Sequence, residues 1–256
     1  MHPQLLILQR YFIKLAYNGT NYHGWQLQEN SHTVQAELNH ALSTVFCEKI
    51  ETTGCGRTDT GVHAKEFYAH FDSGRMDLDD KDLLFKINKF LPKDIGLGKI
   101  FKVNEAAHAR FDAISRTYHY YSSRVKDPFM HGSSYYLYGQ LDLDLMSKAT
   151  QLLFEYTDFS CFSKSRTQVK TNDCTIKEAI WEDKGDVLVF KISANRFLRN
   201  MVRAIVGTLI ETGRKQISLE DFKNIIENKN RFGAGFSVPA EGLFLTKVDY
   251  PEGLIK

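Results

Sequence analysis

The sequence predicts an α+β fold with a mixed, largely antiparallel central sheet flanked by helices. Segments that alternate apolar and polar residues, as strands do, are interspersed with segments whose apolar residues recur at helical spacing. The two kinds do not alternate strictly along the chain, which favours a largely antiparallel sheet. Both halves of the 256 residues contain the same mixture, so we expect two pseudo-repeated lobes, residues 1–107 and residues 108–256.

Alternation and helical spacing place the elements of the first half. The segment RYFIKLAY alternates as a strand does, and the turn signal Asn18-Gly19-Thr20 ends it. Apolar residues from Val34 to Val45 recur at helical spacing, and Pro92 stops a second helix. The expected elements are a strand at 10–17, a helix at 33–47, a strand at 65–71, a helix at 79–91, and strands at 100–103 and 116–123.

The second half is assigned by the same patterns. A turn at residues 183–186 joins two strands, Gly213 is the expected C-terminal cap of a long helix, and Ser218 with Asp221 resembles a capping box. The expected elements are a helix from 145 ending near 158, strands at 174–181 and 186–194, helices at 196–211 and 218–228, and a strand at 243–249.

Composition excludes several classes of protein. Lys and Arg number 33 against 31 Asp and Glu, so the net charge of +2 does not by itself indicate a nucleic-acid partner. The longest apolar runs span only a few residues, which excludes a transmembrane helix, and no cleavable signal peptide is evident. The four cysteines lack zinc-ribbon or disulfide-framework spacing, so we expect a reducing, cytoplasmic location.

A glycine-rich segment, GCGRTDTGVHA at residues 54–64, is the first candidate site. Its three glycines permit close approach of the backbone to a ligand, and Arg57, Thr58 and Asp59 lie between them. The residues alone leave open a turn in which Asp59 only bonds nearby amides. No Gly-Lys-Ser/Thr follows, so the segment is not a phosphate-binding P-loop. Asp59 and His63 could pair on a helical turn, but no third ligand lies near, so no metal is expected.

Three arginines mark the predicted helix at 196–211 as the second candidate. At about 100° per residue, Arg196, Arg199 and Arg203 fall within roughly a 60° arc of a mostly apolar helix. Such arginines suit a buried carboxylate or phosphates, or else a structural stripe of ion pairs. Residues 159–215 carry eleven Lys and Arg against six Asp and Glu, which supports an RNA-binding surface.

The third candidate is the aromatic strand Arg116-Thr117-Tyr118-His119-Tyr120-Tyr121, which Arg124 and Lys126 follow. Aromatic faces beside cations suit stacking on unpaired RNA bases. Packing within a sheet accounts for the same residues.

The segment at residues 54–64 resembles the signature of the TruA family of tRNA pseudouridine synthases. The resemblance extends from Arg10 to Pro251, with Asn18 standing where the family usually has Asp, and Val238-Pro239 where it usually has Ala-Pro. The other matching blocks, in the family's order, are residues 10–20, 24–28, 33–35, 116–118, 127–129, 158–160, 195–207 and 241–250.

The resemblance implies the pseudouridine synthase fold and the isomerisation of uridine to pseudouridine at nucleotides 38, 39 and 40 of the tRNA anticodon stem-loop. The reaction has no redox step and no net hydrolysis, so the resemblance implies neither cofactor nor metal. It further implies a homodimer with tRNA as its partner. The lobe at 1–107 would hold the catalytic loop, and the lobe at 108–256 the stacking tyrosine and the basic helix.

Site residues are carried over position by position. Asp59 matches the catalytic aspartate, which acts either as a nucleophile at C1′ or as a base at C2′. Arg203 matches the arginine that pairs with it and keeps it ionised. Tyr118 matches the tyrosine that stacks on the uracil and is a candidate to take the C5 proton, although a neutral phenol is a weak base. The residues expected to bind RNA are Arg57, Tyr118, Arg196 and Arg199.

Two other functions compete with this one. A noncatalytic RNA-binding protein on the same fold would not need Asp59, Tyr118 and Arg203 together. A hydrolase or zinc deaminase could use Asp59 with His63, but a deaminase would carry His-x-Glu and Pro-Cys-x-x-Cys, and this chain has neither.

Overall fold

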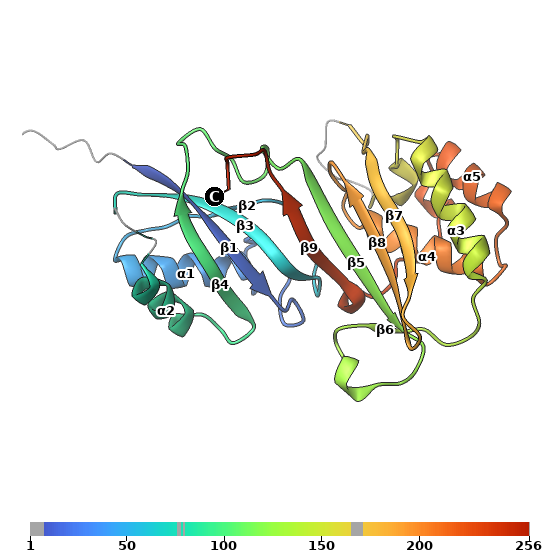
Figure 1. The fold of residues 1–256 in the computed structure, drawn as a ribbon, viewed down its shortest axis with the longest axis horizontal. Helices are drawn as coiled ribbons and strands as arrows, with labels where there is room; N and C mark the ends of the chain where they lie inside the picture. The colour runs from blue at the N-terminus through green and yellow to red at the C-terminus, as the bar shows by residue number, and fades with distance from the viewer. Residues whose placement is uncertain (1–7, 76–77, 79, 165–170, 256) are drawn as a thin grey trace, which may run out of the picture. The chain divides into compact units, whose positions relative to one another are not determined.

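The computed structural model describes residues 8–75, 78, 80–164 and 171–255. Two compact units emerge (Figure 1). Unit 1 comprises the chain up to Ile114 together with the segment from Thr246 onward, and unit 2 comprises Ser115–Leu245. Each unit combines antiparallel strands with helices, which confirms the α+β class and the largely antiparallel sheet. The boundary expected after residue 107, and the division of roles between lobes, stay predictions.

Unit 1 is built on three long antiparallel strands with β1 in the middle. β1 pairs with β3 on one side and β4 on the other, and the short β2 pairs with β3. Phe12, Ile13 and Leu15 of β1 are almost completely buried. Because successive side chains of a strand point to opposite faces of the sheet, both faces of β1 are covered at Phe12 and Ile13. The elements are β1 (Gln9–Tyr17), α1 (Val34–Phe46), β2 (Thr53–Gly54), β3 (His63–Ser73), α2 (Lys81–Phe90) and β4 (Ile95–Lys102).

The two helices of unit 1 begin and end at residues that the sequence marks. Thr33 caps α1 by accepting a hydrogen bond from the Ala36 amide at 3.3 Å. Asp80 caps α2, and Leu91 leaves the helix in an extended conformation directly before Pro92. Both predicted helices are confirmed, although the predicted start of the second, residue 79, lies outside the described residues.

In unit 2, strand β8 lies between β5 and β7, and three helices lie together beside the β7–β8 hairpin (Figure 1). The short β6 runs parallel to β5. The strands are β5 (Ser115–Ser123), β6 (Tyr135–Tyr136), β7 (Ile176–Asp183), β8 (Val187–Ala194) and β9 (Leu243–Asp249), of which β9 leads into unit 1. The helices are α3 (Leu143–Leu152), α4 (Met201–Gly213) and α5 (Leu219–Glu227), with 3₁₀ turns at Pro128–Met130, Leu153–Glu155, Ser160–Phe162, Arg231–Gly233 and Ala240–Gly242.

The predicted helix at 196–211 is wrong at its start. α4 begins at Met201, because Asn200 adopts a left-handed conformation with φ of 67° that interrupts any helix through it. The Asn195 side chain accepts hydrogen bonds from the amides of Thr175 and Arg196, both at 2.8 Å, and holds the preceding chain in another path. The predicted cap is also wrong, since Gly213 is the last helical residue and the left-handed residue is Lys215.

Other boundaries agree or differ in detail. The capping box at Ser218 and Asp221 is present, and β9 coincides with the predicted 243–249. The helix predicted to end near residue 158 changes to a 3₁₀ turn after Leu152. Within the described residues, no helix combines the length and apolarity that a bilayer crossing requires.

Candidate active site

The segment that carries Asp59, called here the Asp59 loop (residues 54–63), joins β2 to β3 and is fixed by its backbone. The Cys55 amide donates to the Tyr68 carbonyl at 2.7 Å, and the Gly61 amide donates to the Tyr22 carbonyl at 3.2 Å. Within the loop, the Val62 amide donates to the carbonyl of Asp59 at 3.1 Å. Bonds before, at and after Asp59 therefore determine where its backbone lies.

Two glycines let residues 18–25 approach this loop closely. A Cβ on Gly24 would lie 2.3 Å from the Thr58 carbonyl oxygen, and a Cβ on Gly19 would lie 2.0 Å from that of Val62. Real Cβ atoms essentially never come within 3.0 Å of another heavy atom. Gly24 also has a φ of +86°, which side chains rarely allow. The loop is thus packed against backbone, with no room for even a methyl group.

Thr58 anchors the centre of the loop. Its side chain is buried, and its hydroxyl exchanges a hydrogen bond with the Tyr17 hydroxyl at 2.9 Å. Its carbonyl accepts from the Trp25 amide at 3.3 Å. On either side of this buried residue, Arg57 is exposed and Asp59 is half-buried. The loop therefore presents a cation and a carboxylate two residues apart on a constrained backbone.

His63 has a structural role in this loop. It begins strand β3, is 1% exposed, and its Nδ1 accepts a hydrogen bond from the Gly19 amide at 3.1 Å. The helical turn that would pair it with Asp59 does not form, because residues 57–62 are not helical and strand β3 begins at His63 itself. Among the described residues, no group of three or more His, Cys, Asp or Glu could hold a metal ion.

Asn18, which departs from the family pattern, keeps the turn in place. Its Oδ1 accepts hydrogen bonds from the Thr20 amide at 3.0 Å and the Thr20 hydroxyl at 2.6 Å. An aspartate would supply the same oxygen. The substitution therefore preserves the geometry of the segment that packs on the Asp59 loop.

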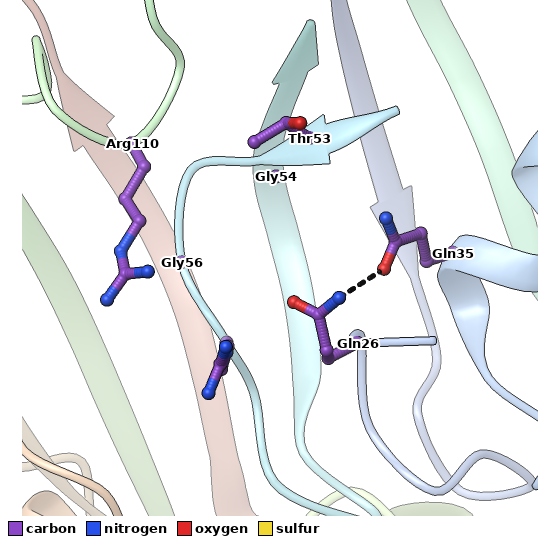
Figure 2. A pocket seen from close by; sticks show the side chains of 7 residues that line it. Gln26, Gln35, Thr53, Gly54, Gly56 and Arg110 are labelled. Atoms are coloured by element: carbon purple, nitrogen blue, oxygen red, sulfur yellow. Dashed lines mark hydrogen bonds between the residues drawn. The ribbon is translucent and has the colours of Figure 1, made fainter. Parts of the chain in front are cut away.

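A small polar cavity of about 80 Å³ opens beside the Asp59 loop in unit 1 (Figure 2). At one side of the cavity the Gln26 side chain donates from Nε2 to Gln35 Oε1 at 3.0 Å, and the Arg110 side chain approaches from the other side. The sequence patterns did not single out this cavity, because Gln26, Arg57 and Arg110 lie far apart along the chain. The lining residues are Gln26, Gln35, Thr53, Gly54, Gly56, Arg57 and Arg110.

Tyr118 and Arg203 belong to unit 2 and are each held by a neighbour there. The half-buried Tyr118 ring on β5 meets Phe197 edge-on, with ring centroids 5.2 Å apart and an interplanar angle of 89°. On α4, Arg203 donates from Nε to the Val238 carbonyl at 2.7 Å, and the Val238 amide donates back to the Arg203 carbonyl at 3.2 Å. These two hydrogen bonds hold Arg203, including its guanidinium, against the segment before β9.

Arg196 and Arg199 precede α4 and do not share a helical face with Arg203. The predicted 60° arc is wrong because the chain is not helical before Met201. Arg196 donates to the Thr171 carbonyl at 3.3 Å, and the carbonyl of the exposed Arg199 accepts from the Lys164 amide at 3.1 Å.

Comparison with known proteins agrees with the fold and identifies the family. A family model described as tRNA pseudouridine synthase matches residues 149–251. The tRNA pseudouridine synthase A of Parabacteroides distasonis is 52% identical over 247 residues, which cover 96% of this chain and 98% of that protein. Proteins of the same name from Bacteroides thetaiotaomicron and Treponema denticola are 50% and 38% identical, covering 96% and 95% of this chain and 93% and 94% of their own.

These similarities define an RNA-modifying isomerase. The chain belongs to the tRNA pseudouridine synthase family, whose members convert uridine to pseudouridine. The recognition of the family from the sequence is therefore confirmed, and the noncatalytic RNA-binding and hydrolase alternatives give way to it.

Proposed function

We propose that this enzyme modifies uridines 38, 39 and 40 in the anticodon stem-loop of tRNA, with Asp59 as its catalytic carboxylate. The observation that supports this most directly is the construction of the Asp59 loop. Its backbone is bonded at Cys55, Thr58 and Gly61 to segments distant in sequence, and it carries a half-buried carboxylate. A group held in this way needs little reorganisation when the substrate arrives.

The reaction explains why one carboxylate suffices. The bond from C1′ to N1 breaks, the uracil turns, and C1′ bonds to C5; the C5 proton leaves, and N1 gains a proton. Atoms and electrons balance without an oxidant, a hydride donor or a net water. Asp59 supports the first step either by attacking C1′ or by removing the C2′ proton. Both routes need a carboxylate with a fixed backbone.

For Tyr118 and Arg203 we propose the roles that the resemblance implies. Tyr118 stacks on the uracil, and its edge contact with Phe197 sets the plane of its ring. Arg203 supplies a positive charge that supports the carboxylate in the reacting enzyme. Its Nε is committed to the Val238 carbonyl, and its terminal nitrogens make no other hydrogen bond within the described residues.

RNA contacts are proposed for Arg57, Arg196 and Arg199, all of which suit phosphate binding. A target uridine within a stem must first leave the helix, at a cost of a few kcal/mol that such contacts offset. We further propose that the enzyme works in the cytoplasm as a homodimer, and sedimentation velocity should give twice the monomer mass of 29.4 kDa. A monomeric mass would contradict that part of the proposal.

Tritium release from tRNA labelled at uridine C5, with a chelator and no added cofactor, tests the catalytic proposal. The wild type should release tritium and Asp59→Asn should not, because the change removes the charge and keeps the shape. Asp186→Asn is the matched control, since Asp186 is exposed in a turn of unit 2. Substrates labelled only at nucleotide 38, 39 or 40 assign the target positions. Release by Asp59→Asn at the wild-type rate would overturn the assignment of Asp59.

A further inference from the structure

We propose that the cavity between Arg57 and Arg110 binds a phosphodiester group of the substrate RNA next to the target nucleotide. We call it the Arg57–Arg110 cavity, defined by the seven lining residues given above. The inference rests on the proposed tRNA substrate and adds Arg110 and Gln26 to the residues that contact it.

Charge is the first observation. Two of the seven lining residues are exposed arginines, and none of the seven is acidic. Arg57 makes no ion pair within the described part of the chain. A guanidinium presents a planar set of donors that matches the oxygens of a phosphate. Two such groups at one small cavity define a site for a compact anion.

The backbone of Arg110 is held in place before any ligand binds. His108 Nδ1 accepts hydrogen bonds from the amides of Arg110 and Phe111 at 3.1 and 3.3 Å. His70 Nδ1 accepts from the Ala109 amide at 3.1 Å. The guanidinium lies over the Phe111 ring at 5.8 Å. Three amides in a row are thereby fixed, which reduces the entropy lost when Arg110 engages an anion.

Gln26 is oriented by a chain of amide contacts. It donates to Gln35 Oε1 at 3.0 Å, and Gln35 in turn donates to the Thr52 carbonyl at 2.6 Å. The Gln26 oxygen points away from Gln35, toward the segment that follows Gly56 (Figure 2). A carboxamide that offers an acceptor and a second N–H suits a ribose hydroxyl beside the phosphate, since that hydroxyl both donates and accepts.

Size and position favour a phosphate near the target. The cavity volume of about 80 Å³ is small, which suits a phosphate better than a stacked base. A Cβ at Gly56 would meet nothing within 4 Å, so this side of the cavity is open because Gly56 has no side chain. Arg57 lies two residues before Asp59, and two residues span at most about 7 Å. The bound phosphate therefore adjoins the nucleotide on which Asp59 acts.

The experiment combines neutral phosphate analogues with one arginine variant of the full-length enzyme. The affinity of anticodon stem-loop RNAs, each carrying one uncharged methylphosphonate, is measured for the wild type and for Arg110→Gln. At one linkage flanking the target uridine, neutralisation should weaken the wild type about tenfold and weaken Arg110→Gln clearly less, because only Arg57 still contacts that phosphate in the variant. Arg75→Gln is the control, because Arg75 is an exposed arginine beyond the opposite end of β3.

Each outcome decides between the site and the reaction. Additive losses at every linkage, or equal affinities for Arg110→Gln and Arg75→Gln, would overturn the cavity as a phosphate site. Tritium release by the wild type is measured on the same unmodified RNA. Coupling at one linkage without any release would leave the phosphate site standing and remove the proposed function. Tritium release with losses that are additive at every linkage would leave the proposed function standing and remove the phosphate site.

Discussion

Replacing Gly207 with alanine should strongly destabilise unit 2, although alanine is the better helix former. Gly207 lies in the middle of α4, where the exchange would on helix propensity alone add about 1 kcal/mol of stability. A Cβ at this position would lie 1.8 Å from the Phe236 carbonyl oxygen. Because an ordinary carbon–oxygen contact is about 3.3 Å or more, helix and segment must separate by about 1.5 Å.

That separation would break the bonds that join α4 to residues 234–238. The Gly235 amide donates to Thr208 Oγ1 at 3.0 Å, and the Val238 amide and carbonyl both bond to Arg203. Strain of about 1–3 kcal/mol and two or three bonds of about 1 kcal/mol each outweigh the gain in propensity. The expected net loss is about 2–5 kcal/mol, or on the order of 10 °C in melting temperature.

Calorimetry of three glycine variants tests this ranking. Gly96→Ala, in strand β4, places its Cβ in open space and should change stability by less than about 1 kcal/mol. Gly213→Ala, at the end of α4, meets only the flexible Met146 side chain within 3 Å and should fall between the other two. Tritium release should fall with Gly207→Ala, since Arg203 loses its support. A Gly207→Ala enzyme as stable as the wild type would refute the reasoning.

Two further predictions concern unit 1. Tyr17→Phe removes the hydroxyl that bonds to the buried Thr58 hydroxyl. The variant should lose about 1–2 kcal/mol of stability in thermal unfolding, and its kcat should fall more than its tRNA affinity. Unchanged stability and kcat would contradict the anchoring role of Thr58. Burial, with Arg10 nearby, lowers the pKa of His70 to about 4. Between about pH 6.5 and 4, His70 is therefore protonated in the unfolded chain but neutral in the folded protein. Stability should therefore fall by up to about 3 kcal/mol between pH 6.5 and 4 in urea titrations, and His70→Gln should remove most of this slope.

Local patterns predicted the elements whose causes are local. The strand β1 and the capping box at Ser218 were each predicted from residues within a few positions of one another, and both are confirmed. The two-residue strand β2 was not predicted, because two residues carry no periodicity. The start of α4 failed for another reason. Apolar spacing continues through residues 196–200, but Asn195 bonds to Thr175, twenty residues earlier, and this contact determines the path of the chain.

The candidate site also has one part that local sequence predicts and one part that depends on residues far apart in the chain. The family signature identified Asp59 without any structure, since its neighbours in sequence are also its neighbours in the loop. The Arg57–Arg110 cavity could not be found in this way, because Gln26 and Arg110 come together only when β1, β3 and β4 have paired. A residue type that is common on protein surfaces, such as Arg110, carries no sequence signal until the fold shows what lies beside it.

Glycine and backbone contacts hold the candidate site residues in place. Thr58 is held through its carbonyl by Trp25, and Arg203 through both backbone groups of Val238. In each case a backbone group bonds the residue, or its neighbour, to a segment far away in sequence. Such bonds survive most side-chain substitutions, because they are made by backbone atoms. They do not survive an added Cβ at Gly24 or Gly207, where the backbones themselves are in contact. The physical constraint on this candidate site therefore lies as much in the side chains that Gly24 and Gly207 lack as in the side chains that are present.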